Sequence, residues 1–133
     1  MAMEQWDAGG NPLSGKRVAV VEDHGLIARV LLLELRRRGA NAQRTELTTQ
    51  ALAWLPLWQP HVAVVDLHLG DGLPRGIDLL PELRAVGTEA LVLTAEKDPA
   101  VHQRCLDAGA AAVLVKTSSV DRILQLLEQL AAT

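Results

Sequence analysis

Residues 62–66, Val62-Ala63-Val64-Val65-Asp66, are four consecutive apolar residues followed directly by a carboxylate. The same pattern occurs over 18–23, where Val-Ala-Val-Val is followed by Glu22 and Asp23. Continuous apolar strands, in contrast to alternating ones, are typical of a parallel sheet that is covered on both faces. The carboxyl ends of parallel strands open onto one edge of the sheet, where such sheets place their ligand sites. The three carboxylates are therefore expected to lie together at that edge.

Three more strands and five helices are expected from the rest of the chain. Two apolar runs lead into Thr94 and Lys116, and a weaker strand is expected over 40–44. Apolar residues at helical spacing predict helices over the intervening segments, namely 25–38, 48–58, 77–83, the segment between Asp98 and Gly109, and from Ser118 or Ser119 onward. This alternation predicts an α/β fold, a doubly wound (βα)5 three-layer sandwich around a five-stranded parallel sheet.

Several residues carry helix start or stop signals. Asp98 followed by Pro99 predicts a helix start, because the carboxylate can cap the first turn and the proline fits within it. Gly109 predicts the end of the same helix. The spacing Ser118-x-x-Asp121 resembles a capping box, which predicts the start of the last helix.

Length and composition limit the class of protein. The 133 residues support one domain, and we expect a flexible N-terminal tail over 1–15 and one folded domain over 16–133. The net charge of −3 argues against direct contact with nucleic acid. No apolar run is long enough for a membrane helix. Cys105 is the only cysteine, which excludes an internal disulfide and favours a reducing compartment, the cytoplasm.

The polar residues at the predicted sheet edge indicate a particular chemistry. Three close carboxylates repel one another unless cations relieve the charge. Lys116 supplies one cation, and Mg²⁺, a hard ion that binds carboxylate and phosphate oxygens, is the natural second. Thr94 and Lys116 can both donate hydrogen bonds to phosphoryl oxygens. The set therefore favours phosphoryl transfer onto a carboxylate, although any one of these acids taken alone could simply cap the following helix.

The ordered set Glu22-Asp23, Asp66, Thr94 and Lys116 resembles the receiver domain of bacterial two-component response regulators. The resemblance covers residues 16–131 and depends on the order and approximate spacing of the motifs. It implies a flavodoxin-like fold for this chain. It also implies that Lys116 holds a phosphoryl group and that Thr94 moves toward that group when it arrives.

The resemblance further implies a phosphoacceptor and a metal site. Asp66 resembles the residue that accepts the phosphoryl group in a Mg²⁺-dependent reaction. Asp23 resembles the direct metal ligand, and Glu22 its neighbour that acts through water. The backbone carbonyl of His68, two residues after the acceptor, would be the third ligand from the protein.

Partners follow from the same resemblance. A histidine kinase or a phosphotransfer protein would supply the phosphoryl group, so the role would be signalling, not metabolic catalysis. The pattern Glu-Asp-His-x-Leu-x-x-Arg, which occurs here over residues 22–29, is common among receivers that control helix-turn-helix DNA-binding outputs. The last predicted helix carries more apolar residues than one packed face needs, which suggests a homodimer; these residues are Val120, Ile123, Leu126, Leu127 and Leu130.

Three departures from the family pattern bear on the switch. Val113 occupies the position of an aromatic ring whose rotation usually reports phosphorylation, and a valine cannot make that movement. Thr117 follows Lys116 where the family has a proline in a cis peptide, and we expect a trans bond because a cis bond without proline costs about 3 kcal/mol. The loop between Asp66 and Gly76 is longer than in common receivers.

Two alternative functions remain open at this point. A degenerate receiver would keep the fold as an interaction module without being phosphorylated, which the missing aromatic and proline favour. A flavin or cobalamin protein could have the same fold. The stretch Asp66-Leu67-His68-Leu69-Gly70 is similar to the Asp-x-His-x-x-Gly loop of cobalamin-binding domains, but Asp71 stands where that motif has its glycine.

Overall fold

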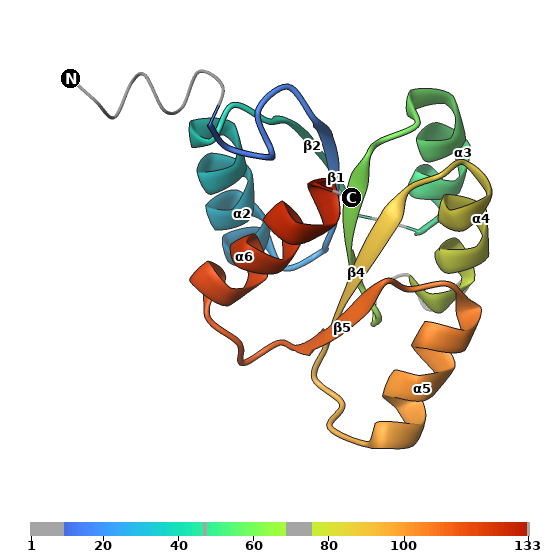
Figure 1. Ribbon diagram of the computed structural model, residues 1–133. Coiled ribbons are helices and arrows are strands. Elements are labelled where there is room, and N and C mark those ends of the chain that lie inside the picture. Colours follow the sequence, from blue (N-terminus) through green and yellow to red (C-terminus); the bar gives the residue numbers. More distant parts are fainter. Residues whose placement is uncertain (1–9, 47, 69–75, 133) are drawn as a thin grey trace.

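A computed structural model describes residues 10–46, 48–68 and 76–132. Its centre is a sheet of five parallel strands in the order β2-β1-β3-β4-β5 (Figure 1). The strands are β1 (Arg17–Val21), β2 (Asn41–Thr45), β3 (Val62–Asp66), β4 (Glu89–Thr94) and β5 (Ala112–Val115). The predicted parallel sheet is confirmed, and β3 lies in its middle.

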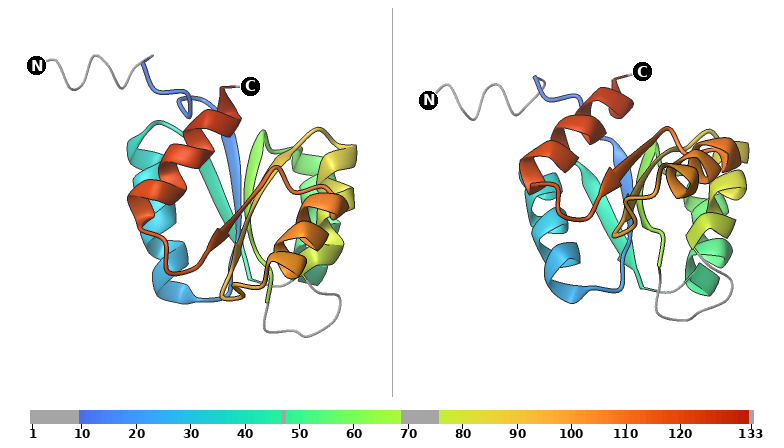
Figure 2. Two further views of the ribbon diagram at one scale, coloured as in Figure 1. Left: turned by 60° about the horizontal axis from the view of Figure 1, so that its bottom comes forward. Right: turned by 90° about the horizontal axis from the view of Figure 1, so that it is seen from below.

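Helices cover both faces of the sheet, as the doubly wound fold requires (Figures 1 and 2). The helices are α2 (Gly25–Arg37), α3 (Thr48–Trp58), the short 3₁₀ helix η1 (Gly76–Asp78), α4 (Leu79–Ala85), α5 (Pro99–Ala108) and α6 (Val120–Ala131). One face carries α2 and α6, and the other carries α3, α4 and α5. Within the described residues, none of these helices is both long and apolar enough to cross a membrane.

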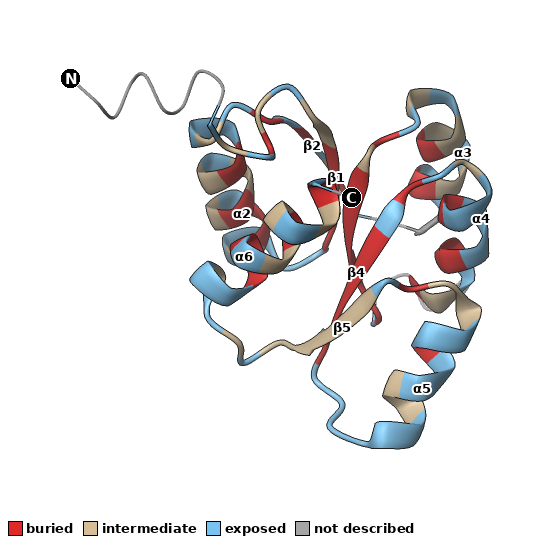
Figure 3. Ribbon diagram, viewed as in Figure 1, coloured by how far each residue is buried: buried red, intermediate tan, exposed pale blue. Residues whose placement is uncertain are grey.

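Two apolar cores follow from the alternation of side chains along each strand. Val18 and Val20 point to the core beneath α2 and α6, whereas Ala19 and Val21 point to the core beneath α3, α4 and α5. All five residues of β3 are buried, and Figure 3 shows the centre of the sheet as the most buried part of the fold. Burial on both faces explains why the strand sequences are continuously apolar.

Helix caps agree with the sequence at one helix and shift by one residue at another. Asp98 accepts a hydrogen bond from Ala100 N at 2.9 Å and caps α5, which ends at Gly109 with a φ of 122°. The cap of α6 is Ser119, whose Oγ accepts from Arg122 N at 3.1 Å. The predicted capping box that begins at Ser118 is therefore wrong by one residue, because Ser119 has the extended backbone that an N-cap needs.

The folded part of the chain begins earlier than predicted. Of the expected tail over 1–15, residues 1–9 lie outside the described residues, but Leu13 is fully buried in the core beneath α2 and α6. Asn11 accepts from Leu13 N at 2.9 Å and donates to Glu128 Oε2 on α6 at 2.8 Å. The boundary at residue 16 is thus too late, since an apolar side chain and a polar bridge attach this segment to the domain.

The apolar residues of α6 serve the core of this chain. Ile123 and Leu127 are buried, and Val120, Leu126 and Leu130 pack partly buried against the same core. The number of apolar residues on this helix therefore has an explanation within one copy of the chain. The homodimer remains a prediction, but the apolar residues of α6 are no longer a reason to expect it.

Candidate functional site

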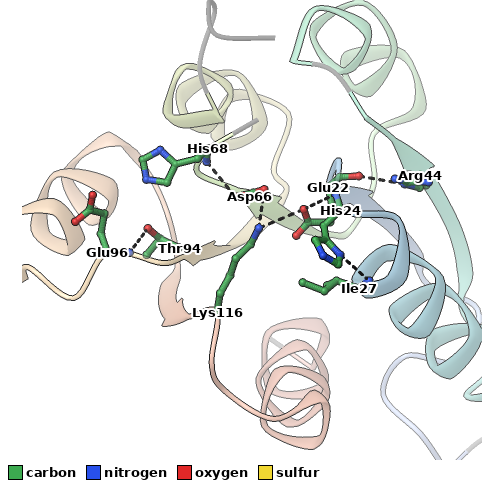
Figure 4. A network of polar contacts seen from close by, with 9 residues as sticks. All are labelled: Glu22, His24, Ile27, Arg44, Asp66, His68, Thr94, Glu96 and Lys116. Atoms are coloured by element: carbon green, nitrogen blue, oxygen red, sulfur yellow. Dashed lines mark hydrogen bonds and ion pairs between the residues drawn. The ribbon is translucent and has the colours of Figure 1, made fainter. Parts of the chain in front are cut away.

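Strand register places the polar residues at one edge of the sheet. Val21 of β1 pairs with Val65 of β3, so Glu22 and Asp66, the residues that follow them, are level with each other. On the other side of β3, Thr94 ends β4 and pairs with Val115, the residue before Lys116. Glu22 and Thr94 accordingly lie on opposite sides of Asp66, as Figure 4 shows.

Lys116 joins the two buried carboxylates. Its Nζ donates to Asp66 Oδ2 at 2.9 Å and to Glu22 Oε2 at 3.4 Å (Figure 4). The side chain of Lys116 is 24% exposed, whereas those of Glu22 and Asp66 are 0% and 1% exposed. Burial works to lower the pKa of the ammonium, but the hydrogen bond and negative charge of Asp66, with the charge of Glu22, raise it above its ordinary value. Lys116 is therefore a permanent cation at this edge.

Glu22 is the unusual carboxylate of the site. Its Oε2 accepts from the backbone N–H of His24 at 3.0 Å, but within the described part of the chain its buried Oε1 has no hydrogen-bond partner. The pKa of Glu22 is raised from 4.5 to about 7, chiefly by burial; the hydrogen bond from His24 and the charge of Lys116 oppose the rise, and neighbouring Asp66 adds to it. A buried carboxylate oxygen without a donor is costly unless a cation or water completes it.

The donor set fits a hard divalent cation. Oxygen atoms of Glu22, Asp23 and Asp66 all lie within 4.8 Å of one another. Carboxylate oxygens are the ligands that Mg²⁺ prefers, and the unpartnered Glu22 Oε1 offers one such oxygen. Asp66 Oδ1 accepts from His68 N at 3.0 Å, which holds the main chain of His68 beside this carboxylate. That the His68 carbonyl binds the metal stays a prediction.

Thr94 is buried, and its hydroxyl already accepts a hydrogen bond from the loop that follows it. Its Oγ1 accepts from Glu96 N at 3.0 Å, and its carbonyl accepts from Lys116 N at 2.7 Å. The carbonyl of Glu96 lies 2.7 Å from His102 Nε2 on α5. Glu96 therefore contacts the hydroxyl of Thr94 through its N–H and His102 on α5 through its carbonyl. These two contacts link the hydroxyl of Thr94 to α5.

Two contributors to the site were not found from the sequence. A side chain at Gly76 would overlap the backbone carbonyl of Asp66, so only glycine allows the chain to return this closely beside Asp66. Arg44 of β2 donates from Nε to the carbonyl of Glu22 at 3.1 Å. The glycine at the start of η1 was a usable signal, whereas nothing local in the sequence connects Arg44 with Glu22.

The fold and this edge define a doubly wound α/β domain in which a partly buried lysine contacts two buried carboxylates. The chain matches the response regulator receiver domain family over residues 18–128 and belongs to that family. It is thus a receiver domain of two-component signalling, as the ordered motifs suggested. The match leaves the flavin and cobalamin alternative without support.

Sequence relatives are response regulators of greater length. The chain is 30% identical over 116 residues to the acid tolerance regulatory protein ActR of Sinorhizobium medicae, covering 86% of this chain and 59% of the relative. It is 29% identical to the virulence transcriptional regulatory protein PhoP of Salmonella choleraesuis, covering 86% and 51%. The chain therefore spans about half to three fifths of the length of these curated relatives.

Solved structures agree with the family. A Burkholderia pseudomallei response regulator, solved with a phosphorylated aspartic acid, a calcium ion and citrate, is 28% identical with a TM-score of 0.77, over 88% of this chain and 69% of that chain. The receiver domain of the Francisella response regulator 1452 shares the fold, with a TM-score of 0.80 and 23% identity over 88% and 97%.

The three departures from the family pattern have different outcomes. Val113 of β5 is half-buried and packs against the core beneath α3, α4 and α5, with no ring to rotate. The predicted long loop between Asp66 and Gly76 falls largely on residues 69–75, which lie outside the described residues. The trans bond at Thr117 stays a prediction.

Proposed function

We propose that this receiver accepts a phosphoryl group on Asp66 from a histidine kinase or a phosphotransfer protein, in a Mg²⁺-dependent reaction. The observation that carries the proposal is the contact of 2.9 Å between Lys116 Nζ and Asp66 Oδ2, beside a second buried carboxylate with an unpartnered oxygen. A purely structural ion pair would need neither Glu22 nor Asp23 at the same edge.

In the proposed reaction, a carboxylate oxygen of Asp66 attacks phosphorus. A phosphorus–oxygen bond forms while the bond between phosphorus and a histidine nitrogen of the donor protein breaks. The imidazole of that histidine, which is the leaving group, takes up a proton. Mg²⁺, held by Glu22, Asp23 and Asp66, would supply neutralising charge to the phosphoryl oxygens. The ammonium of Lys116 donates to a phosphoryl oxygen and remains charged throughout.

The switch in this chain would run through the loop after Thr94. When the hydroxyl of Thr94 turns toward the phosphoryl group, Glu96 N loses the acceptor that it has at 3.0 Å. The loop between Thr94 and Asp98 then repacks and carries with it the contact between Glu96 and His102 on α5. This route needs no aromatic ring at Val113. Structures with and without a phosphoryl mimic that keep the same main chain over this loop would refute it.

An apolar groove leads to the site and suits a helical phosphodonor. It has a volume of about 220 Å³ and lies between α2 and the start of α6, with Lys116 among its lining residues. Leu26, on its rim, is 68% exposed. Such a groove accepts the apolar face of a partner helix, so that a histidine on that helix could reach Asp66. The Leu26→Ser variant should slow transfer from a kinase but not from a small phosphodonor.

The decisive experiment is intact-protein mass spectrometry after incubation with acetyl phosphate. We expect a phosphoryl adduct that requires Mg²⁺ and is absent from Asp66→Asn. Asp98→Asn, which alters an exposed carboxylate at the cap of α5, is the matched control and should retain the adduct. A folded protein that gives no adduct with Mg²⁺ would favour the degenerate interaction module instead.

The setting of the domain is also part of the proposal. ActR and PhoP are named as regulatory proteins, and PhoP as a transcriptional one. We infer that this receiver controls an output of the same kind, in the cytoplasm, without touching DNA itself. Expression profiling after replacing Asp66 with asparagine in the source cell would test that inference.

A further inference from the structure

Both the N–H and the carbonyl of Glu22 make hydrogen bonds to residues of the neighbouring strand β2. Its N–H donates to Thr45 O at 3.1 Å, which continues the β1–β2 ladder one residue past the end of β1. Its carbonyl accepts from Arg44 Nε at 3.1 Å (Figure 4). The second contact replaces a ladder bond with a side chain, at the point where the chain turns away from the sheet.

The position of Arg44 suits this contact. It pairs with Val20 in the parallel register, and its side chain is only 22% exposed. Its Nη2 lies 3.3 Å from Glu46 Oε1, close enough for an ion pair but without hydrogen-bond geometry. The guanidinium therefore lies between an exposed carboxylate and the Glu22 carbonyl, on the side of Glu22 that is away from Asp66 and Lys116 (Figure 4).

The carbonyl of Glu22 belongs to the peptide plane that joins Glu22 to Asp23. Because a peptide unit is planar, a donor on that oxygen fixes the direction of the backbone on both sides of it. The two acidic side chains leave from either end of this plane. Losing the donor would let the plane rotate, which would disturb both carboxylates together while leaving β1 intact.

We propose that Arg44 is a positioning residue for the acid pair, and that it sets the affinity of the site for a divalent cation. This inference rests on the proposed function, since it concerns the same metal site. Outer partners that orient metal ligands typically change metal affinity by 10–100-fold when they are removed. For one hydrogen bond to a carbonyl we expect the lower end, a loss of about 10-fold.

The test compares Arg44→Gln and Arg44→Lys with a matched control. The control is Arg36→Gln, because Arg36 also donates to a β2 carbonyl, Ala42 O at 2.8 Å from Nη2, but is not part of the acid site. Mg²⁺ binding is measured by titration calorimetry on the full chain, and unfolding by urea. A second readout is the Mg²⁺ concentration that half-saturates the rate of phosphorylation by acetyl phosphate.

We expect Arg44→Gln to weaken Mg²⁺ binding about 10-fold and to raise the half-saturating concentration equally, with an unchanged rate at saturation. Arg44→Lys should recover part of the affinity, and Arg36→Gln should keep all of it. Equal Mg²⁺ affinity in Arg44→Gln and the wild type, or an equal loss in Arg36→Gln, would overturn the inference alone. A wild type that binds no Mg²⁺ would overturn it together with the proposed function.

Discussion

Replacing Glu22 with glutamine should stabilise the metal-free protein at pH 8. Glu22 is fully buried, and burial with its neighbours raises its pKa from 4.5 to about 7. Above pH 7 the folded protein therefore carries a charge that the unfolded chain solvates far better. Between pH 4.5 and about 7 the folded state binds more protons than the unfolded state, so its stability falls as pH rises through that window.

The size of the expected stabilisation follows from the pKa shift of Glu22 and from the cost of burying the amide that replaces its carboxyl group. A rise from 4.5 to about 7 corresponds to at most about 3 kcal/mol of folding free energy. This shift already includes the attraction of Lys116, so the offset that remains is the amide of the variant, which is buried without full hydrogen bonding and costs about 1–2 kcal/mol. We therefore expect a net gain of about 1–2 kcal/mol for Glu22→Gln, or about 3–6 °C in Tm.

Thermal and urea unfolding in a chelator, at pH 8 and at pH 4.5, measure this gain. The advantage of the variant should be present at pH 8 and absent at pH 4.5, where the wild-type carboxyl is protonated in the folded state. Saturating Mg²⁺ should stabilise the wild type more than the variant, because the charged carboxylate then has a cation. Glu82→Gln, at an exposed position on α4, is the control and should change nothing. The same difference at both pH values, or a variant no more stable at pH 8, would refute the reasoning.

Four further variants test the packing around the site and at the ends of the domain. Gly76→Ala should cost about 1–3 kcal/mol in urea unfolding, because its Cβ would overlap the Asp66 carbonyl, and it should also slow phosphorylation; wild-type values for both would contradict the close approach. Leu13→Ala should cost about 2–5 kcal/mol in the same assay, whereas a side chain in a flexible tail would cost nothing. Ser119→Ala should lower stability by about 1 kcal/mol and Ser118→Ala by much less; the reverse order would restore the capping box at Ser118.

Much of the fold was determined by residues that are close in sequence. A run such as Val62–Val65 has the β-branched composition of a strand, and its apolar residues on both faces require a covered parallel sheet. Asp98-Pro99 and Gly109 marked α5 correctly because a cap interacts with backbone groups only a few residues away. Signals of this kind can be recognised from the sequence because they involve residues that are close together along the chain.

The candidate site was predicted in part for the same reason. Each polar residue directly follows an apolar strand, and parallel strands bring such positions to one edge whatever the order of the strands. That rule was enough to group Glu22, Asp66 and Lys116 before any distance was known. Their roles in the family came from resemblance, which local physics alone does not provide.

Tertiary structure decided which of these residues touch. Only the strand order places β3 between β1 and β4, so that Asp66 has Glu22 on one side and Thr94 on the other. The unpartnered oxygen of Glu22 likewise depends on what the packed core leaves nearby. Sequence spacing carries no information on such contacts.

Two further features depend on tertiary structure: the start of the folded domain, and the hydrogen bond from Arg44 to the carbonyl of Glu22. Leu13 looks like part of a polar tail until α2 and α6 provide the core that buries it. Arg44 is an ordinary strand residue until β2 lies beside β1 and its guanidinium meets the carbonyl of Glu22. The sequence alone determined the strands, most helix ends and the residues at the sheet edge, because those depend on neighbouring residues. Contacts between distant segments depend on how the finished elements pack, and only the folded chain decides them.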